Sequence, residues 1–131
     1  MSLIPTTLYY AAAVINAISI PGHISFGINE VDPAIAKIPE DRKHALGKAT
    51  VTTAWDMVNA LLAASVLLNI KWSKYGVRTW EEKIIIGTSV VAGTLTGWRY
   101  FKVRSYGGLG CLWAAPWFTL GAMISQQLGS L

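Results

Sequence analysis

The stretch that decides the fold class reads GKATVTTAWDMVNALLAASVLLNI and runs from Gly47 to Ile70. At a rise of about 1.5 Å per residue, a helix of this length crosses a hydrocarbon core of roughly 30 Å. Three similar apolar stretches cover approximately residues 3–26, 84–101 and 109–128. Backbone polar groups cannot stay unpaired in lipid, and the stretches lack the period-2 alternation of a membrane β-strand. Each is therefore expected to be a helix.

The composition also indicates a membrane protein. Of 131 residues, 53% are hydrophobic and only 14% are charged, whereas an ordinary soluble domain carries about 25% charged residues. This balance argues against a soluble monomer, a disordered chain and a DNA-binding domain. We expect one integral membrane domain over residues 1–131, with the lipid bilayer around it and no nucleic-acid partner. Cys111 is the only cysteine, which excludes an intramolecular disulfide and a multi-cysteine metal site.

Short polar links between the apolar stretches favour antiparallel neighbours, so the expected fold is all-α, a four-transmembrane-helix up-down bundle. Residues 27–46 form the longest expected loop, and residues 102–108 form a short turn. Seven Lys or Arg residues flank these two connections, and four flank the remaining link. This bias predicts a multi-pass protein with both connections in the cytoplasm, in the endoplasmic reticulum or another internal membrane if the source is eukaryotic. The first stretch lacks a preceding basic region, so we expect a retained helix rather than a signal peptide.

Asp56 is the most informative residue, because an acid deep in a membrane span is costly. It lies about nine residues, or roughly 13 Å, into the second stretch. An acid near mid-membrane costs on the order of 2.5–3.5 kcal/mol. Thr52, Asn59 and Ala63 share its helical face. The pattern predicts either a proton donor or ligand-binding carboxylate inside the bundle, or a hydrogen-bonded acid that holds helices together.

The first stretch carries a matching polar stripe of Asn16, Ser19 and His23. Depth can be counted from the membrane surface at which the first stretch ends and the second begins. On this count Asn16 lies level with Asp56, and His23 lies near that surface. A histidine could move protons to or from a buried acid. Alternatively, His23 is an interfacial residue that follows a break in the helix at Pro21. A single His and a single Asp do not make a zinc site, so no metal is expected.

Arg99 stands near the end of the third stretch. It either snorkels to the headgroups or points inward to Asp56 or an anionic headgroup. Trp113 and Trp117 are one turn apart in the fourth stretch, and they form one aromatic surface at about the depth of Asp56. Such a surface could wall a pocket for an apolar ligand, or it could face lipid or pack in the core.

The layout resembles the small four-span DoxX-like membrane proteins, including uncharacterised fungal ones. The resemblance rests on the number of expected spans, on Ile20-Pro21-Gly22-His23 with the Phe26-Gly27 turn after it, and on Trp55-Asp56-x-x-Asn59. It covers most of the chain and implies four membrane helices. Some members of that broad class oxidise lipophilic aromatic compounds, and the resemblance assigns no catalytic residue here. The layout alone is also similar to that of scaffold proteins of the ergosterol pathway.

Two functions are compatible with these residues. In the first, the protein is a small membrane enzyme or binder for a sterol, terpenoid or polyketide, with Asp56 as the acid or base. Three polar residues would orient this acid: Asn16, His23 and Asn59. Four further residues would contact the ligand: Thr52, Arg99, Trp113 and Trp117. Nothing in the sequence identifies a cofactor.

In the second function, the protein is a non-catalytic scaffold or subunit that packs against other membrane proteins or a second copy of itself. Gly93 and Gly97 form a Gly-xxx-Gly motif, which lets another helix approach closely, either within the bundle or between molecules. A cavity around Asp56 would favour the first function. Outward-facing glycines above a filled core would favour the second.

Overall fold

The structure is a computed structural model and describes residues 3–129. Every element in this range is helical. In chain order, the elements are α1 (Leu3–Phe26), the π-helical turn η1 (Gly27–Val31), α2 (Asp32–Ala36), α3 (Ala45–Tyr75), α4 (Trp80–Lys102), the 3-10 turn η2 (Tyr106–Gly108), the π-helical turn η3 (Gly110–Ala114) and α5 (Ala115–Leu128). The all-α class predicted from the sequence is confirmed.

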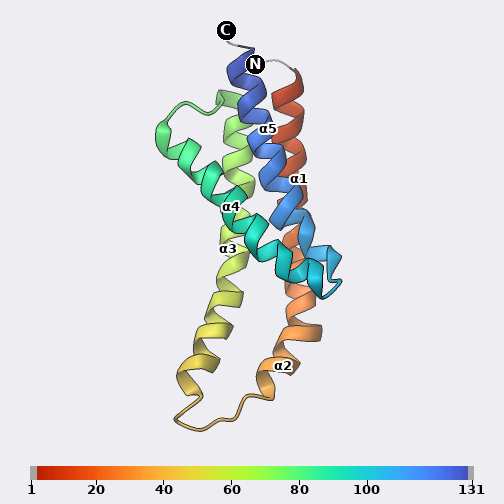
Figure 1. The fold of residues 1–131 in the computed structure, drawn as a ribbon, viewed down its shortest axis with the longest axis vertical. Coiled ribbons are helices and arrows are strands. Elements are labelled where there is room, and N and C mark those ends of the chain that lie inside the picture. The colour runs from red at the N-terminus through yellow and green to blue at the C-terminus, as the bar shows by residue number, and fades with distance from the viewer. Residues whose placement is uncertain (1–2, 130–131) are drawn as a thin grey trace.

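Four long helical stretches make up the described chain, because η1 and α2 continue α1, and η3 leads into α5 (Figure 1). The chain descends along α1, returns along α3, descends obliquely along α4 and returns along α5 (Figure 1). The start of α1 and the end of α5 therefore lie at the same end of the molecule. Helix α1 packs against both α3 and α5, and α4 packs against η3 and α5.

Three of these stretches are long and apolar enough to cross a membrane: Leu3–Ala36, Ala45–Tyr75 and Tyr106–Leu128. Their length and composition are those of membrane helices. The stretch predicted at 84–101 does form a helix, α4, but it is not one of the three. Threonines, serine and glycines dilute its apolar residues, and Arg99 lies near its end. The four predicted helices are thus present, and three of them have the character of membrane spans.

The first α-helix, α1, ends at Phe26, as the sequence predicted, but η1 and α2 continue the helical path to Ala36. Pro21 lies inside α1 without ending it. The wide π-helical turn η1 follows, and Pro33 occupies one of the first positions of α2, where a missing N–H costs little. The predicted loop 27–46 is therefore wrong in extent, because only residues 37–44 separate the two helices.

Helix α3 has 31 residues, whereas about 20 are enough to cross a hydrocarbon core. Its N-terminal part and α2 extend beyond the lower ends of α4 and α5 (Figure 1). Most side chains of this extension are exposed. We call the extension, residues 27–54, the helical arm. The arm stands clear of the packed part of the bundle.

The best-packed region lies at the end opposite the helical arm. Each of the four long helical stretches, and the link between α3 and α4, contributes one buried residue to it. These residues are Tyr9, Trp72, Val77, Ile86 and Ala122. Burying such side chains contributes on the order of 2 kcal/mol for each large one, so this core holds all four helices together.

Gly93 and Gly97 of α4 face the interior. A Cβ atom on Gly93 would collide with the carbonyl oxygen of Leu112, and one on Gly97 would collide with the indole of Trp113. The two glycines therefore let η3 approach α4 closely. The Gly-xxx-Gly motif serves packing within one molecule, which was one of the two alternatives from the sequence.

Candidate functional site

Two adjoining cavities form a cleft between α3 and α4. The upper cavity has a volume of about 390 Å³ and is lined by α1, α3, α4, η3 and α5. The lower cavity, of about 490 Å³, extends to the end of α1 and to the turn after α4. Four residues line both cavities: Val58, Thr96, Cys111 and Leu112. We refer to the two cavities together as the interhelical cleft.

The interhelical cleft opens sideways. Leu61 of α3, and Ile85 and Ser89 of α4, line the upper cavity and are also exposed on the outside of the protein. These residues lie along the two helices rather than at an end of the bundle. In a bilayer, a molecule dissolved in the hydrocarbon would meet this opening directly.

The interhelical cleft is apolar and carries no fixed charge. No Asp, Glu, Lys or Arg lines it within residues 3–129. Its titratable side chains are His23, Tyr100 and Cys111. A buried ion without a counter-charge is strongly disfavoured, so the cleft suits an uncharged molecule.

Asn16 of α1 lines the upper cavity and is only 5% exposed. None of the described residues forms a hydrogen bond with its side-chain amide. Its amide atoms are accessible, since Asn59 Oδ1 is the one fully enclosed side-chain polar atom without a partner among the described residues. Asn16 therefore presents hydrogen-bonding capacity that a bound molecule could satisfy.

Two other buried polar residues of the upper cavity, Asn69 and Thr119, are paired. The Thr119 hydroxyl lies 2.8 Å from Asn69 Oδ1 and 2.9 Å from the Ala115 carbonyl oxygen. Asn69 Nδ2 donates to the Ser65 carbonyl at 2.9 Å. These contacts join α3 to α5, and interhelical bonds of this kind contribute roughly 0.6–2 kcal/mol in membranes. Asn69 and Thr119 are thus structural, in contrast to Asn16.

His23 lines the lower cavity and is held in place by Trp55. Its ring stacks on the Trp55 indole with 3.9 Å between centroids, and its Nε2 lies 2.9 Å from the Trp55 carbonyl oxygen. A carbonyl oxygen only accepts, so Nε2 carries the proton of the neutral ring and Nδ1 keeps a lone pair. No described residue bonds to Nδ1. His23 therefore offers one acceptor in a fixed orientation.

Asp56 does not face the interhelical cleft. Its side chain is exposed and lines neither cavity. It forms no ion pair with Arg99 within the described chain. Trp55, Val58 and Leu62 pack inward, and successive residues differ by about 100° around a helix, so position 56 turns outward. The expectation that Asp56 lies inside the bundle is wrong.

The other polar residues predicted around this acid lie in three different locations. Asn16 and His23 line the interhelical cleft. Thr52 and Arg99 are exposed, and the Thr52 hydroxyl donates to a backbone carbonyl one turn earlier. Asn59 is half-buried with its Oδ1 enclosed and without a partner among the described atoms, yet it lines neither cavity. The first helix therefore contributes both cleft residues that the sequence indicated.

Trp113 and Trp117 lie on another face of the protein. With Trp98 they line an outer groove of about 440 Å³. Trp113 Nε1 donates to the Thr94 carbonyl at 3.3 Å, and Trp117 is 52% exposed. Neither tryptophan lines the interhelical cleft, so the expected aromatic wall beside Asp56 does not form.

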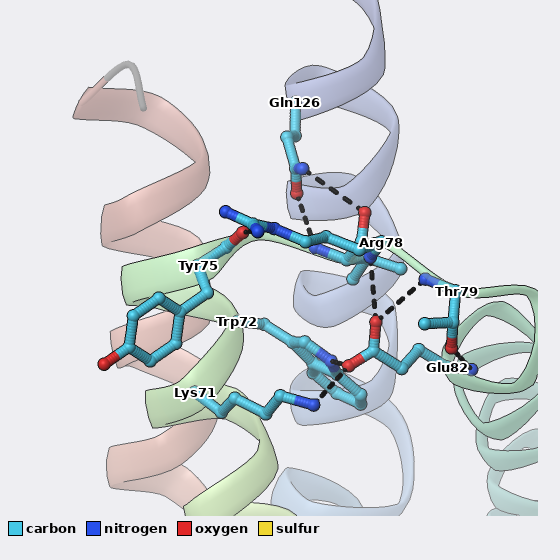
Figure 2. Close-up of polar contacts among 8 residues, drawn as sticks. Lys71, Trp72, Tyr75, Arg78, Thr79, Glu82 and Gln126 are labelled. Carbon is cyan, nitrogen blue, oxygen red and sulfur yellow. Dashed lines mark hydrogen bonds and ion pairs between the residues drawn. The ribbon is translucent and has the colours of Figure 1, made fainter.

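A polar cluster absent from the sequence interpretation joins α3 to α4 (Figure 2). Lys71 Nζ and Trp72 Nε1 donate to Glu82 Oε1 at 2.7 and 3.0 Å. The backbone N–H groups of Arg78 and Thr79 donate to Glu82 Oε2 at 2.8 and 3.1 Å. Thr79 and Glu82 also form a capping box at the start of α4. The Thr-x-x-Glu spacing is the signal that could have revealed it.

Glu82 lies outside the three membrane-span candidates and is buried. Burial alone raises the pKa of Glu82, but the hydrogen bonds that it accepts, with that from Lys71 the strongest, outweigh burial and lower the pKa to about 2. The carboxylate is therefore ionised at neutral pH, and both of its oxygens are occupied. Its role is to fix the α3–α4 turn.

Gln126 of α5 secures the same turn (Figure 2). Its Oε1 accepts from the Val77 N–H at 3.0 Å and from the Tyr9 hydroxyl at 3.3 Å. Gly76 has a φ of 71°, and a Cβ atom there would collide with the Gln126 side chain. The turn is thus held between α1 and α5, which fixes the point from which α3 and α4 diverge around the cleft.

Within residues 3–129, no three His, Cys, Asp or Glu side chains gather as a metal site would require. Comparison of the chain with protein-family models, curated proteins and solved structures finds no match.

Proposed function

We propose that the protein binds an uncharged lipophilic molecule with at least one polar group, in the interhelical cleft, within a membrane. The single observation that carries this proposal is the Asn16 amide, which lines an apolar cavity and has no hydrogen-bond partner among the described residues. A few polar groups in an otherwise apolar cavity are the usual means by which a protein orients a bound small molecule.

The dimensions and chemistry of the cleft support a small-molecule ligand. Ligand cavities commonly occupy about 300–1,000 Å³ and combine apolar walls with a few polar groups. The two cavities, of about 390 and 490 Å³, fit this description. A sterol, a terpenoid or a polyketide has suitable size and apolarity. The sideways opening lets such a molecule enter from the bilayer without crossing water.

The proposal assigns binding rather than catalysis. An acid–base role for Asp56 would need its carboxylate beside the ligand, and this side chain is exposed on the outside of α3. Among residues 3–129, His23 is the one basic group that lines the cleft. If the protein transforms its ligand, for example by isomerisation, His23 is the residue to accept the proton.

A scaffold role is the second candidate, and the exposure of α3 favours it. Asp56 and Met57 lie on the outward face of this helix, where a partner helix would cover them and an unpaired acid would gain a partner. Against this role, Gly93 and Gly97 face inward and already contact η3 of the same molecule, so they offer no surface to a partner helix. The partner would be another membrane protein or a second copy.

The membrane orientation belongs to the same proposal. We place residues 37–44 and the turn after α4 on the cytoplasmic side, because most Lys and Arg residues flank these two connections. In a eukaryotic cell, the endoplasmic reticulum or another internal membrane would hold the protein.

The test uses Cys111, the only cysteine of the chain and a residue that lines both cavities. The protein is reconstituted in phospholipid nanodiscs, and its alkylation by N-ethylmaleimide is timed with and without cholesterol or farnesol. A molecule in the cleft should slow alkylation of Cys111. Ala92→Phe, which fills the upper cavity, should remove this protection.

Ala64→Phe is the matched control, because Ala64 is exposed and lines neither cavity. It should leave the protection intact. Lipid extracts of the purified variants provide a second readout, in which the wild-type protein and Ala64→Phe retain a co-purified lipophilic molecule and Ala92→Phe does not. If no probe slows alkylation and no such molecule co-purifies, binding in the cleft is refuted.

A further inference from the structure

We infer that the ligand carries two hydrogen-bonding groups about 10 Å apart, one facing Asn16 and the other a hydroxyl that donates to His23 Nδ1. This inference rests on the proposed function. It adds the spacing and the polarity of the ligand's functional groups, and it requires one molecule to occupy both cavities.

The spacing follows from helix geometry. Asn16 and His23 are seven residues apart on α1, which corresponds to a rise of roughly 10.5 Å and a rotation within about 20° of two full turns. Both residues therefore lie on the same face of the helix. Asn16 lines the upper cavity and His23 the lower one.

The two cavities adjoin, because the same four residues line both, and a single ligand would pass beside these residues. Val58 and Leu112 are apolar, and Thr96 and Cys111 already donate their polar hydrogens to backbone carbonyls. Ser19 lies between the two polar residues on α1, but its hydroxyl donates to the Ile15 carbonyl at 2.8 Å. The ligand segment between the two polar groups should therefore be hydrocarbon.

The polarity at each end follows from the hydrogen-bond inventory. His23 Nε2 already donates to the Trp55 carbonyl, so the free Nδ1 can only accept, and the ligand group there must be a donor. The stacked Trp55 ring fixes the imidazole before the ligand arrives, which reduces the entropy lost on binding. The Asn16 amide both donates and accepts, so it can pair with a carbonyl or a hydroxyl.

The experiment compares two isomers of equal composition, 1,8-octanediol and 1,2-octanediol. The hydroxyls of the extended 1,8 isomer lie at about the distance between the two residues, whereas those of the 1,2 isomer are adjacent. Protection of Cys111 from N-ethylmaleimide is titrated with each isomer in nanodiscs. The 1,8 isomer should protect at a roughly fivefold lower concentration, the effect of one additional net hydrogen bond.

Two variants assign the effect to its residues. Asn16→Leu and His23→Phe should each abolish the difference between the isomers, and Asn16→Ala replaces Asn16→Leu if the larger side chain prevents folding. His44→Phe is the matched control, because His44 lines neither cavity, and it should preserve the difference.

The outcomes separate the inference from the proposed function. Equal protection by the two isomers, or no protection by either while cholesterol or farnesol protects, would overturn the inference and leave the proposed function standing. A difference that persists in Asn16→Leu or His23→Phe would also overturn the inference. Failure of all four probes, with no co-purified molecule, would overturn both.

Discussion

Asn16 is a residue whose energetic cost and proposed use are linked. Its amide lines the upper cavity and has no hydrogen-bond partner within the described chain. A polar side chain among apolar walls contributes less to the stability of the empty protein than an apolar side chain of similar size would. The same group adds affinity for a ligand that restores the missing bonds. Stability and binding should therefore respond in opposite directions when the amide is removed.

We predict that Asn16→Leu stabilises the ligand-free protein by about 1 kcal/mol, because it places an apolar side chain against the apolar walls of the cavity. The measurement is the free energy of unfolding in detergent after removal of bound lipid. In the presence of cholesterol or farnesol, the variant should gain less stability than the wild-type protein does. A loss of stability in the ligand-free variant would show that the amide has a partner and would contradict its assignment as a ligand-binding group.

The residue scale also shows what sequence can predict. Asn16 and His23 could be identified because both lie on one face of a single helix, and this relation is set by helical geometry alone. The sequence could not predict that the Asp56 side chain points outward. The rotation of α3 about its axis depends on how Trp55 packs against His23 in the folded protein. A polar residue in an apolar stretch is visible from sequence, whereas the face that packs inward is decided by tertiary contacts.

At the scale of elements, the turn between α3 and α4 is held mainly by Glu82. The carboxylate accepts bonds from the side chains of Lys71 and Trp72 and from two backbone N–H groups. An isosteric amide has one acceptor oxygen and cannot satisfy donors on both sides. The angle at which α4 leaves α3 depends on this arrangement.

We predict that Glu82→Gln destabilises the protein by roughly 2 kcal/mol or more, because it leaves buried donors unpaired. Thermal unfolding in detergent measures the loss. Glu81→Gln is the matched control, because Glu81 is the adjacent acid and is exposed, and it should change stability by less than about 0.5 kcal/mol. Equal effects of the two substitutions would contradict the role given to Glu82.

The pH dependence of stability provides an independent check. The pKa of Glu82 is about 2 in the folded protein, below its ordinary value of 4.5, so the folded state favours the ionised form. Its contribution is complete above pH 4.5 and is lost as the pH falls towards 2. The wild-type protein should therefore lose more stability than Glu82→Gln over this interval, and parallel losses would count against the bonded carboxylate.

The two glycines of α4 that contact η3 support a further prediction. Gly93→Ala should destabilise the protein by about 1–3 kcal/mol, since its Cβ would be forced against the backbone of Leu112. Gly87→Ala on the same helix is the matched control, because a Cβ at Gly87 meets no atom within 4 Å. This control should be neutral or stabilising by up to about 1 kcal/mol, as helix propensity favours alanine. Similar effects at the two sites, measured by thermal unfolding, would refute the close packing of η3.

Element boundaries were predicted unevenly, for identifiable reasons. The apolar stretches revealed all four helices, because membrane-length hydrophobicity is a strong local signal. The continuation through η1 and α2 was not predicted, since Pro21 and Pro33 are usual signs of a helix end. In the structure Pro33 stands at the start of a helical turn, where it is tolerated. The oblique course of α4 depends on Glu82 and on contacts distant in sequence.

At the scale of the whole molecule, the helices differ in length, which determines how much of each can lie in a bilayer. Helix α3 has 31 residues, so it would extend about 46 Å. The lower cavity brings Trp55 level with Gly107 in the turn after α4, and basic residues flank this turn. If the membrane surface lies at this level, the helical arm projects into water, and Asp56 lies near the headgroups rather than at mid-membrane. At that depth, the free-energy cost of leaving the Asp56 carboxylate exposed is small.

We predict that Ala49→Cys reacts with a membrane-impermeant maleimide and that Ala63→Cys does not, both in a Cys111→Ser background. Ala49 and Ala63 are both exposed on α3, so the two sites differ in depth rather than in packing. Counted from the aromatic end of the helix at Trp72, Ala63 lies about 13 Å along α3 and Ala49 about 35 Å, beyond a hydrocarbon core of roughly 30 Å. In sealed vesicles the reagent should reach Ala49→Cys from the cytoplasmic side. If neither site reacts, the helical arm lies in lipid. If both sites react, α3 is not embedded in the membrane, and a lipophilic ligand has no sideways route from the bilayer into the cleft.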